Sequence, residues 1–274
     1  MPESSIPFVN IEALNATIIK AGQLIMQHYR SAALGIFHKS DRSPVTNADR
    51  EAHQLICEHL QQLTPHFPIL SEEGEPVSYT TRQTWETFWL VDPLDGTLEF
   101  IEQTGQFAVC IGLIHCCYPV IGAIYLPVMQ TLFFANGKQT FKLNANGTVM
   151  RLQLPAEPLH NPLRAVYSKG KMPERDARFF SNLGISQIDF VGSAIKYCTI
   201  AEGQADIFYR SRANHEWDSA AGQAIIEQAG GHVLNLDGER FAYNKSSLVN
   251  PPFVCLGFSN KSLIMRALQM ANAW

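Results

Sequence analysis

The sequence predicts a layered α+β protein in which helices pack against a mixed β-sheet. Two observations indicate this class. A meander of apolar, β-branched segments bounded by Gly, Pro or Asn occupies residues 106–115, 119–127, 130–135, 139–143 and 149–154. From residue 163 onward, strand-like and helix-like segments alternate, which is typical of helices that cover a sheet.

The first part of the chain is expected to hold two amphipathic helices and a short strand. Apolar residues recur at helical spacing over residues 11–29, and Asn10 precedes them as a cap. A polar loop at residues 37–45 leads to a second helix at 46–63. Residues 68–71 are expected to form a strand that ends in an acidic run.

The central strand is predicted at residues 88–91. These residues are continuously apolar, as expected for a strand that is buried on both faces. Pro93 lacks a backbone donor and is expected to end the strand ladder. Gly96 then supplies the backbone freedom that a tight reversal needs.

The second half of the chain is predicted to alternate between the two kinds of element. Strands are expected at 163–167, 187–191, 205–209, 232–235 and 253–257, and helices at 173–183, 193–202, 217–230 and from 259 onward. Because residues 155–162 are polar and rich in proline, we place a domain boundary there. This divides the chain into an N-terminal domain at 1–156 and a C-terminal domain at 157–274.

Composition and charge exclude several classes of function. The chain has 274 residues, of which 46% are hydrophobic, and its net charge of −4 gives no general attraction to nucleic acid. Six cysteines without a Cys-x-x-Cys pair favour a reducing cytoplasm, and the N-terminus lacks the pattern of a signal peptide. Residues 103–137 carry no formal charge, but their prolines, glycines and β-branched residues predict buried strands rather than a membrane span. The nine histidines show no His-x-x-x-His spacing, and we interpret them as ordinary residues.

One turn combines several oxygen ligands. Asp92 and Asp95 lie three residues apart, with the Leu94 carbonyl between them and the Thr97 hydroxyl just after. Hard divalent cations such as Mg²⁺ prefer such oxygens, so this segment could supply much of a metal site. The alternative is ordinary turn chemistry, since Asp is favoured in turns without any metal.

Other acidic residues allow the same two interpretations. Asp49 fits a helix-capping pattern with Thr46, and Asp218 fits the first turn of a helix, where its charge is favourable. Glu72 and Glu73 fit a solvated loop. The functional alternative is that these acids face the turn at residues 92–97.

Three motifs carry a family resemblance. Residues 71–73 (SEE), 91–97 (VDPLDGT) and 217–222 (WDSAAG), in this order, resemble those of the inositol monophosphatase superfamily of Mg²⁺-dependent, lithium-sensitive phosphatases. The resemblance covers roughly residues 11–258. It implies the αβαβα sandwich of the sugar (inositol) phosphatase type.

Further stretches are similar to the 3′(2′),5′-bisphosphate nucleotidase, or CysQ-like, branch of this superfamily. They are residues 39–49 (KSDRSPVTNAD), 97–100, 192–205 and Arg210. These enzymes remove the 3′-phosphate of adenosine 3′,5′-bisphosphate. The resemblance therefore implies a phosphoric monoester hydrolase of sulfur metabolism that acts on a phosphorylated nucleotide, either this compound or its 5′-phosphosulfate relative.

The resemblance also implies roles for individual residues. It implies that two or three Mg²⁺ ions are held by Glu72, Asp92, the Leu94 carbonyl, Asp95 and Asp218. Asp49 and Thr97 would orient and deprotonate the attacking water, and the substrate would contact Gly96, Thr97, Ser193, Lys196 and Arg210. Glu73 would be a supporting acid, although the sequence does not choose between Glu72 and Glu73.

The sequence departs from the family pattern in segments that are expected to bind the substrate. They are Leu98, where the family often has Lys, residues 167–171 (YSKGK) and residues 211–214 (SRAN), and they leave the roles of Lys169, Lys171 and Arg212 open. The alternatives are an inositol monophosphatase or sugar bisphosphatase, and a catalytically silent metal-binding scaffold. We expect neither a nucleic-acid partner nor a membrane span, and we leave open peripheral contact with the inner face of the plasma membrane and the choice between monomer and homodimer.

Overall fold

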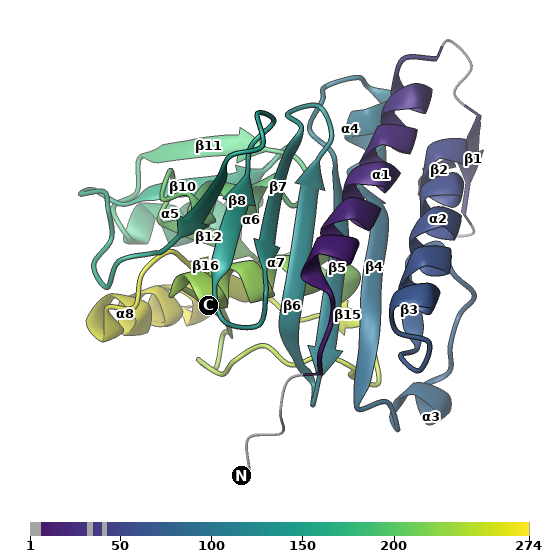
Figure 1. The fold of residues 1–274 in the computed structure, drawn as a ribbon. Coiled ribbons are helices and arrows are strands. Elements are labelled where there is room, and N and C mark those ends of the chain that lie inside the picture. Colours follow the sequence, from purple (N-terminus) through teal and green to yellow (C-terminus); the bar gives the residue numbers. More distant parts are fainter. Residues whose placement is uncertain (1–6, 32–34, 40–42, 274) are drawn as a thin grey trace.

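The computed structural model describes residues 7–31, 35–39 and 43–273. Figure 1 shows five layers. Helices α1 (Ile11–Tyr29) and α2 (Asn47–Leu63) cover one face of a seven-stranded sheet, and α6 (Ile195–Ala201) and α7 (Trp217–Ala229) lie between that sheet and a five-stranded sheet. Helices α5 (Glu174–Asn182) and α8 (Lys261–Asn272) cover the outer face of the second sheet. The predicted αβαβα sandwich is confirmed.

The seven-stranded sheet is mostly antiparallel. Its order is β3-β4-β5-β6-β7-β8-β9, and only β3 and β4 run parallel. The bounds are β3 (Ile69–Ser71), β4 (Thr87–Asp95), β5 (Ala108–His115), β6 (Tyr118–Leu126), β7 (Thr131–Ala135), β8 (Thr140–Leu143) and β9 (Val149–Leu152). Because β3 and β4 are parallel, the acidic residues at their C-terminal ends lie at the same end of the strand pair.

The five-stranded sheet is mixed. Its order is β11-β10-β12-β16-β14, in which β10 runs parallel to both neighbours and β16 antiparallel to both. The bounds are β10 (Arg164–Ser168), β11 (Gln187–Val191), β12 (Ile207–Arg210), β14 (His232–Asn235) and β16 (Phe253–Leu256). Two further strand pairs, β1 (Ile36–His38) with β2 (Pro44–Thr46) and β13 (Asn214–His215) with β15 (Val249–Asn250), and two short helices, α3 (Tyr79–Arg82) and α4 (Thr97–Ile101), complete the fold.

Strand alternation divides the apolar residues between separate cores. In β4, Trp89 and Val91 face the core formed with α1 and α2, whereas Phe88 and Leu90 face the core around α7. The core around α7 also contains residues of the five-stranded sheet, so both sheets are buried against the same two helices. The division of the chain into domains at 1–156 and 157–274 stays a prediction.

One expectation about the central strand was wrong. Strand β4 continues through Pro93 to Asp95 rather than ending at the proline. Its pairing with β5 is irregular between Asp92 and Asp95, and the pairing with β3 already ends at Val91. Pro93 therefore lies where the ladder is interrupted, so its missing N–H costs no regular ladder bond.

The loop expected at residues 37–45 is also partly ordered, because it contains most of the β1–β2 hairpin. Residues 40–42 of that loop lie outside the described residues. The short elements α3, α4, β13 and β15 were not predicted either. Each spans two to five residues, which is too short for a periodic pattern to form.

The uncharged stretch at residues 103–137 forms the buried strands β5, β6 and β7, as predicted. In the described part of the chain, every helix is too short or too polar to cross a membrane.

Two glycines allow α7 to lie unusually close to the large sheet. A Cβ atom built on Gly122 of β6 would lie 2.5 Å from the carbonyl oxygen of Ala221, and one on Gly112 of β5 would lie 2.9 Å from the Cβ of Ala220. Ala220 and Ala221 lie where the first turn of α7 passes into the second. These two contacts therefore set the distance between the sheet and the start of this helix.

We expect Gly122→Ala to lower the free energy of unfolding by about 1–3 kcal/mol, because the new methyl group must displace the α7 backbone. Urea unfolding in the absence of metal measures this change. Met150→Leu, on the exposed β9, is the control and should change it by less than about 0.5 kcal/mol. Since Ala is intrinsically favoured over Gly in a strand, a stabilised Gly122→Ala variant would contradict the close approach.

Candidate metal and phosphate site

Three carboxylates converge where β3, β4 and α7 meet. Glu72 follows β3, Asp92 lies in β4, and Asp218 lies in the first turn of α7. Their oxygens approach within 4.8 Å of one another. The backbone N–H of Glu72 donates to the Val91 carbonyl at 3.0 Å, which ties the acidic segment to the neighbouring strand.

Burial makes this group of carboxylates electrostatically costly. Asp92 is 2% exposed, and burial together with Glu72 and Asp95 raises the pKa of its carboxyl well above the ordinary value. Burial and the Asp95 carboxylate raise the pKa of Asp218 to about 7. Such a site strongly favours a proton or a metal cation over unpaired negative charge.

Lys39 pairs with both acids that follow β3. Its Nζ lies 2.8 Å from Glu72 Oε1 and 2.6 Å from Glu73 Oε1. Burial alone would lower the pKa of the Lys39 ammonium, but these hydrogen bonds raise it overall. Of the two glutamates, Glu72 has its oxygens close to those of Asp92 and Asp218. Ser40 and Asp41, which belong to the same sequence motif as Lys39, lie outside the described residues.

Asp95 and the Leu94 carbonyl each lie within hydrogen-bond distance of a hydroxyl group. The Ser193 hydroxyl donates to Asp95 Oδ2 at 2.8 Å. The Leu94 carbonyl oxygen lies 3.2 Å from the Thr97 hydroxyl. Asp95 therefore links the large sheet to the loop before α6, and the Leu94 carbonyl faces Thr97; their roles as metal ligands stay predictions.

Asp49 both caps α2 and contacts Thr97 at the end of β4, while its catalytic role stays a prediction. Its Oδ2 accepts hydrogen bonds from the Thr46 backbone N–H at 2.8 Å and from the Thr46 hydroxyl at 2.5 Å, as a helix cap does. Its Oδ1 lies 3.0 Å from the Thr97 hydroxyl. Burial raises the pKa of Asp49, although the bonds with Thr46 and Thr97 partly offset this effect.

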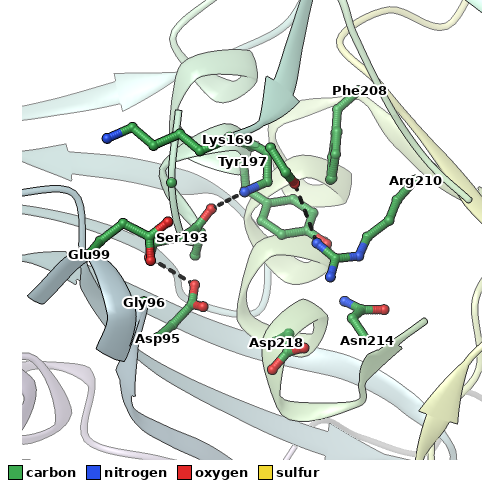
Figure 2. Close-up of a pocket in the computed structure, with 14 residues that line it drawn as sticks. Asp95, Gly96, Glu99, Lys169, Ser193, Tyr197, Phe208, Arg210, Asn214 and Asp218 are labelled. Carbon is green, nitrogen blue, oxygen red and sulfur yellow. Dashed lines mark hydrogen bonds between the residues drawn. The ribbon is translucent and has the colours of Figure 1, made fainter. Parts of the chain in front are cut away.

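A cavity of about 190 Å³ adjoins the carboxylates (Figure 2). Its walls combine two acids, Asp95 and Asp218, with basic and polar residues from α6, the loop before it and the second sheet. Of the five predicted substrate-contacting residues, Gly96, Ser193, Lys196 and Arg210 line it, whereas Thr97 does not. Gly96 adopts φ 93°, a left-handed conformation that turns the chain from β4 into α4.

The two predicted cations of the cavity are held differently. Lys196 is 5% exposed, its ammonium donates to the Ser193 carbonyl, and burial lowers its pKa to about 8. Among the described residues, the Arg210 guanidinium has contacts of 3.2 Å to the Arg212 carbonyl, 3.4 Å to the Ala213 carbonyl and 3.5 Å to the Ser168 hydroxyl. A phosphate could replace such weak contacts readily.

Several cavity residues were missed by sequence reasoning. Asn214 is 6% exposed and lines the cavity, and within the described residues its Oδ1 has no hydrogen-bond partner. The Tyr197 hydroxyl is in the same situation. Both residues lie in segments that the resemblance marks, residues 192–205 and 211–214, but it assigns neither of them a role, because their positions follow from the β13–β15 pair and from the packing of α6 on α7.

The basic residues whose roles the sequence left open lie at different distances from the site. Lys169 is exposed and lines the cavity. The Arg212 guanidinium donates to the Lys171 carbonyl at 2.8 Å, and neither residue lines the cavity. Leu98, at the position where the family often has Lys, is 55% exposed.

Comparison with known proteins identifies relatives over nearly the whole chain. The model of the inositol monophosphatase family matches residues 9–272. The 3′(2′),5′-bisphosphate nucleotidase CysQ of Salmonella typhimurium is 40% identical over 235 residues, which cover 85% of this chain and 94% of the relative. CysQ of Escherichia coli K12 is 39% identical with the same coverage.

Solved structures agree with this relationship. The crystal structure of CysQ from Bacteroides thetaiotaomicron matches with a TM-score of 0.79 at 34% identity, covering 91% of this chain and 97% of that one. The SuhB protein of Bartonella henselae, at 24% identity, shares the fold with a TM-score of 0.77 over 96% of this chain and 98% of that one. The predicted resemblance and the predicted enzyme class, a phosphatase, are confirmed. This family is metal-dependent, and the chain belongs to the inositol monophosphatase family.

Proposed function

We propose that the protein hydrolyses the 3′-phosphate of adenosine 3′,5′-bisphosphate to give AMP and inorganic phosphate, with Mg²⁺ as the cofactor. One observation carries the proposal: the cavity that Asp95 and Asp218 line is also lined by two basic residues, Lys196 and Arg210. A substrate with two phosphates matches this distribution of charge, since the carboxylates with metal would take one phosphate and the cations the other. The relatives named CysQ are nucleotidases that act on such compounds.

The ligand types favour Mg²⁺. Glu72, Asp92, Asp95 and Asp218 offer carboxylate oxygens, and Leu94 offers a carbonyl, so the donor set is entirely oxygen. We propose two or three ions, held by these residues. When bound, they would neutralise the charge of the phosphoryl group and lower the pKa of a bound water.

We propose that Asp49 and Thr97 handle the proton of the attacking water. The Thr97 hydroxyl lies 3.0 Å from Asp49 Oδ1 and 3.2 Å from the Leu94 carbonyl oxygen, and when it donates to Asp49 its oxygen is an acceptor for a water. As that water attacks phosphorus, its proton would pass through Thr97 to Asp49. The raised pKa of Asp49 makes it a better proton acceptor than an ordinary aspartate. The backbone amides of Gly96 and Thr97 would bind the phosphate oxygens.

A second phosphate on the substrate would account for the basic residues that line the cavity. Arg210 would exchange its long backbone contacts for a forked pair of hydrogen bonds to phosphate. Lys196 and Ser193 lie beside it, with the Lys196 ammonium bonded to the Ser193 carbonyl. An inositol monophosphate carries no second anion for these basic residues, which is why we prefer the nucleotide.

The proposal places the enzyme in the cytoplasm, acting on a small-molecule nucleotide without a nucleic-acid partner. It is made for a monomer or a homodimer alike, because every residue to which it assigns a role belongs to one chain. Contact with the inner membrane face is not needed for the chemistry.

The test is phosphate release from adenosine 3′,5′-bisphosphate beside inositol 1-phosphate and fructose 1,6-bisphosphate, in Mg²⁺ and then with EDTA or lithium added. We expect preference for the nucleotide, loss of release in EDTA and a lower rate in lithium. Preference for the inositol or sugar ester would keep the metal mechanism and overturn the substrate. If no substrate gives metal-dependent release, the chain is a silent scaffold.

The Asp92→Asn variant tests whether Asp92 is a metal ligand or an acid with a structural role only. Because the folded-state pKa of Asp92 is raised, its favourable contribution to stability is present at low pH and is lost as pH rises through that pKa. At pH 8 in EDTA, the variant should therefore be at least as stable as the wild type. Adding Mg²⁺ at 100 times its dissociation constant should stabilise the wild type by about 2.7 kcal/mol and the variant by far less.

Urea unfolding with and without Mg²⁺ measures both effects of Asp92→Asn. Asp237→Asn, at an exposed acid, is the matched control and should behave like the wild type in both conditions. A variant that is weakened in EDTA but keeps the full Mg²⁺ effect would show that Asp92 is structural.

Arg210→Ala should harm turnover of adenosine 3′,5′-bisphosphate much more than turnover of adenosine 3′-monophosphate. Losing a charge-assisted bond costs about 1.5–3 kcal/mol, or roughly a 10- to 100-fold loss in kcat/KM for the bisphosphate. Steady-state kinetics on both substrates measures this, with Arg212→Ala as the control. Equal losses on the two substrates would mean that Arg210 does not contact the second phosphate.

A further inference from the structure

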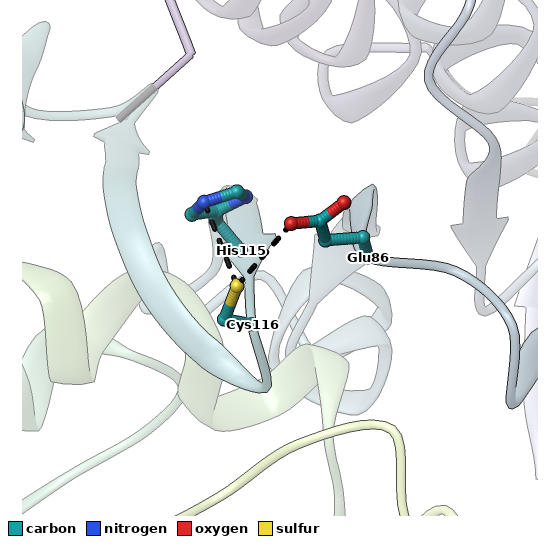
Figure 3. Close-up of side chains that lie close together, drawn as sticks. All are labelled: Glu86, His115 and Cys116. Carbon is teal, nitrogen blue, oxygen red and sulfur yellow. Dashed lines mark hydrogen bonds between the residues drawn. The ribbon is translucent and has the colours of Figure 1, made fainter. Parts of the chain in front are cut away.

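A second group of metal-binding side chains lies at the other end of the β4–β5 strand pair. It consists of Glu86, His115 and Cys116, which Figure 3 shows turned toward one another. The Cys116 Sγ lies 3.6 Å from His115 Nε2 and 3.6 Å from Glu86 Oε1. Strand β4 starts at Thr87 and β5 ends at His115, so this group is at the opposite end of β4 from Asp92 and Asp95.

Strand pairing holds the three residues in place. Thr87 is the register partner of His115, and the backbone N–H of Cys116 donates to the Glu86 carbonyl at 2.9 Å. The Thr87 hydroxyl lies 2.8 Å from His115 Nδ1. Histidines that bind metals generally donate one ring N–H to an oxygen and use the other nitrogen as the ligand. With Nδ1 facing Thr87, His115 presents Nε2 to the cysteine and the glutamate.

The turn that carries Cys116 has an unexpected sequence. Cys116 and Cys117 form the two-residue loop between β5 and β6, and both have positive φ, 49° and 68°. Hairpin turns of this kind strongly favour Asn-Gly, because other residues pay a steric penalty there. The Tyr243 backbone N–H donates to the Cys117 carbonyl at 2.9 Å and fixes the loop. The chain thus uses a thiol where turn stability alone would favour asparagine or glycine.

We propose that Glu86, His115 and Cys116 form a Zn²⁺ site with a water molecule as the fourth ligand. Zinc prefers four ligands of the nitrogen, sulfur and oxygen types in a tetrahedron, with Zn–S about 2.3 Å and Zn–N about 2.0–2.1 Å. These bond lengths place sulfur and nitrogen about 3.5–3.6 Å apart. The observed Cys116 Sγ–His115 Nε2 distance of 3.6 Å matches this separation without any movement of the backbone.

The chemistry of the two groups distinguishes them. The carboxylate group offers oxygen alone, which suits Mg²⁺, whereas this group offers one thiol, one imidazole and one carboxylate, which suit Zn²⁺. Binding would release the thiol proton of Cys116 to solvent, since the thiolate is the ligand. The zinc site is independent of the phosphatase proposal, because the two groups share no residue.

Cobalt provides a probe that reports the thiolate directly. We would titrate Co²⁺ into the reduced full-length protein in excess Mg²⁺, follow the sulfur-to-cobalt charge-transfer absorption, and then displace cobalt with Zn²⁺. An all-oxygen site gives no such band, so cobalt at the carboxylate group does not interfere. We expect one thiolate-bound cobalt per chain, displaced by Zn²⁺.

Variants make the assignment specific. Cys116→Ser should abolish the band, while Cys117→Ser, in the same exposed turn, should retain it. Thr87→Val should weaken cobalt binding about 10- to 100-fold, because it removes the oxygen that orients His115. Mg²⁺-dependent phosphatase activity should be unchanged in Cys116→Ser, which shows that this variant folds. Absence of the band in the wild type, its persistence in Cys116→Ser, or its equal loss in Cys117→Ser would overturn the proposal.

Discussion

The repulsion among closely spaced carboxylates, of which Asp92 is buried, is the constraint around which the candidate active site is built. Glu72, Asp92 and Asp218 lie on three different elements, and their oxygens come within 4.8 Å of one another. Such an arrangement persists only if the surrounding structure holds it, since each acid would gain by moving into water. The five layers provide that support, because β3, β4 and α7 are fixed by cores on both faces of the large sheet.

The same constraint explains why residues of the site carry structural bonds as well. Asp49 caps α2 through Thr46 and also lies within hydrogen-bond distance of Thr97, so the start of a helix and the proposed proton path share one carboxylate. Ser193 donates to Asp95 and its carbonyl accepts from Lys196, which joins a proposed metal ligand to a proposed phosphate contact. These shared bonds pre-position the side chains before substrate arrives, which is a major part of catalysis in phosphoryl transfer.

The sequence predicted the long elements well, because they leave local patterns, and the acidic motifs were marked by their family resemblance; the roles of the individual acids stay predictions. Helical periodicity marked α1 and α2, and Asp92, Asp95 and Gly96 lie within five residues at the end of β4. What it missed depends on contacts between distant segments. Pro93 could not be recognised as lying in an irregular stretch of β4 without the register of β5, and the burial of Asn214 depends on its pairing with Asn250.

The Glu86, His115 and Cys116 group also depends on a contact between distant segments, which the sequence pattern does not reveal. A search for metal motifs examines short spacings along the chain, whereas Glu86 and Cys116 are neighbours only because β4 and β5 pair antiparallel. That pairing also places oxygen ligands at one end of β4 and sulfur and nitrogen ligands near the other. Because Mg²⁺ and Zn²⁺ differ in the ligands they prefer, one strand pair can present two cation sites that do not compete for the same metal.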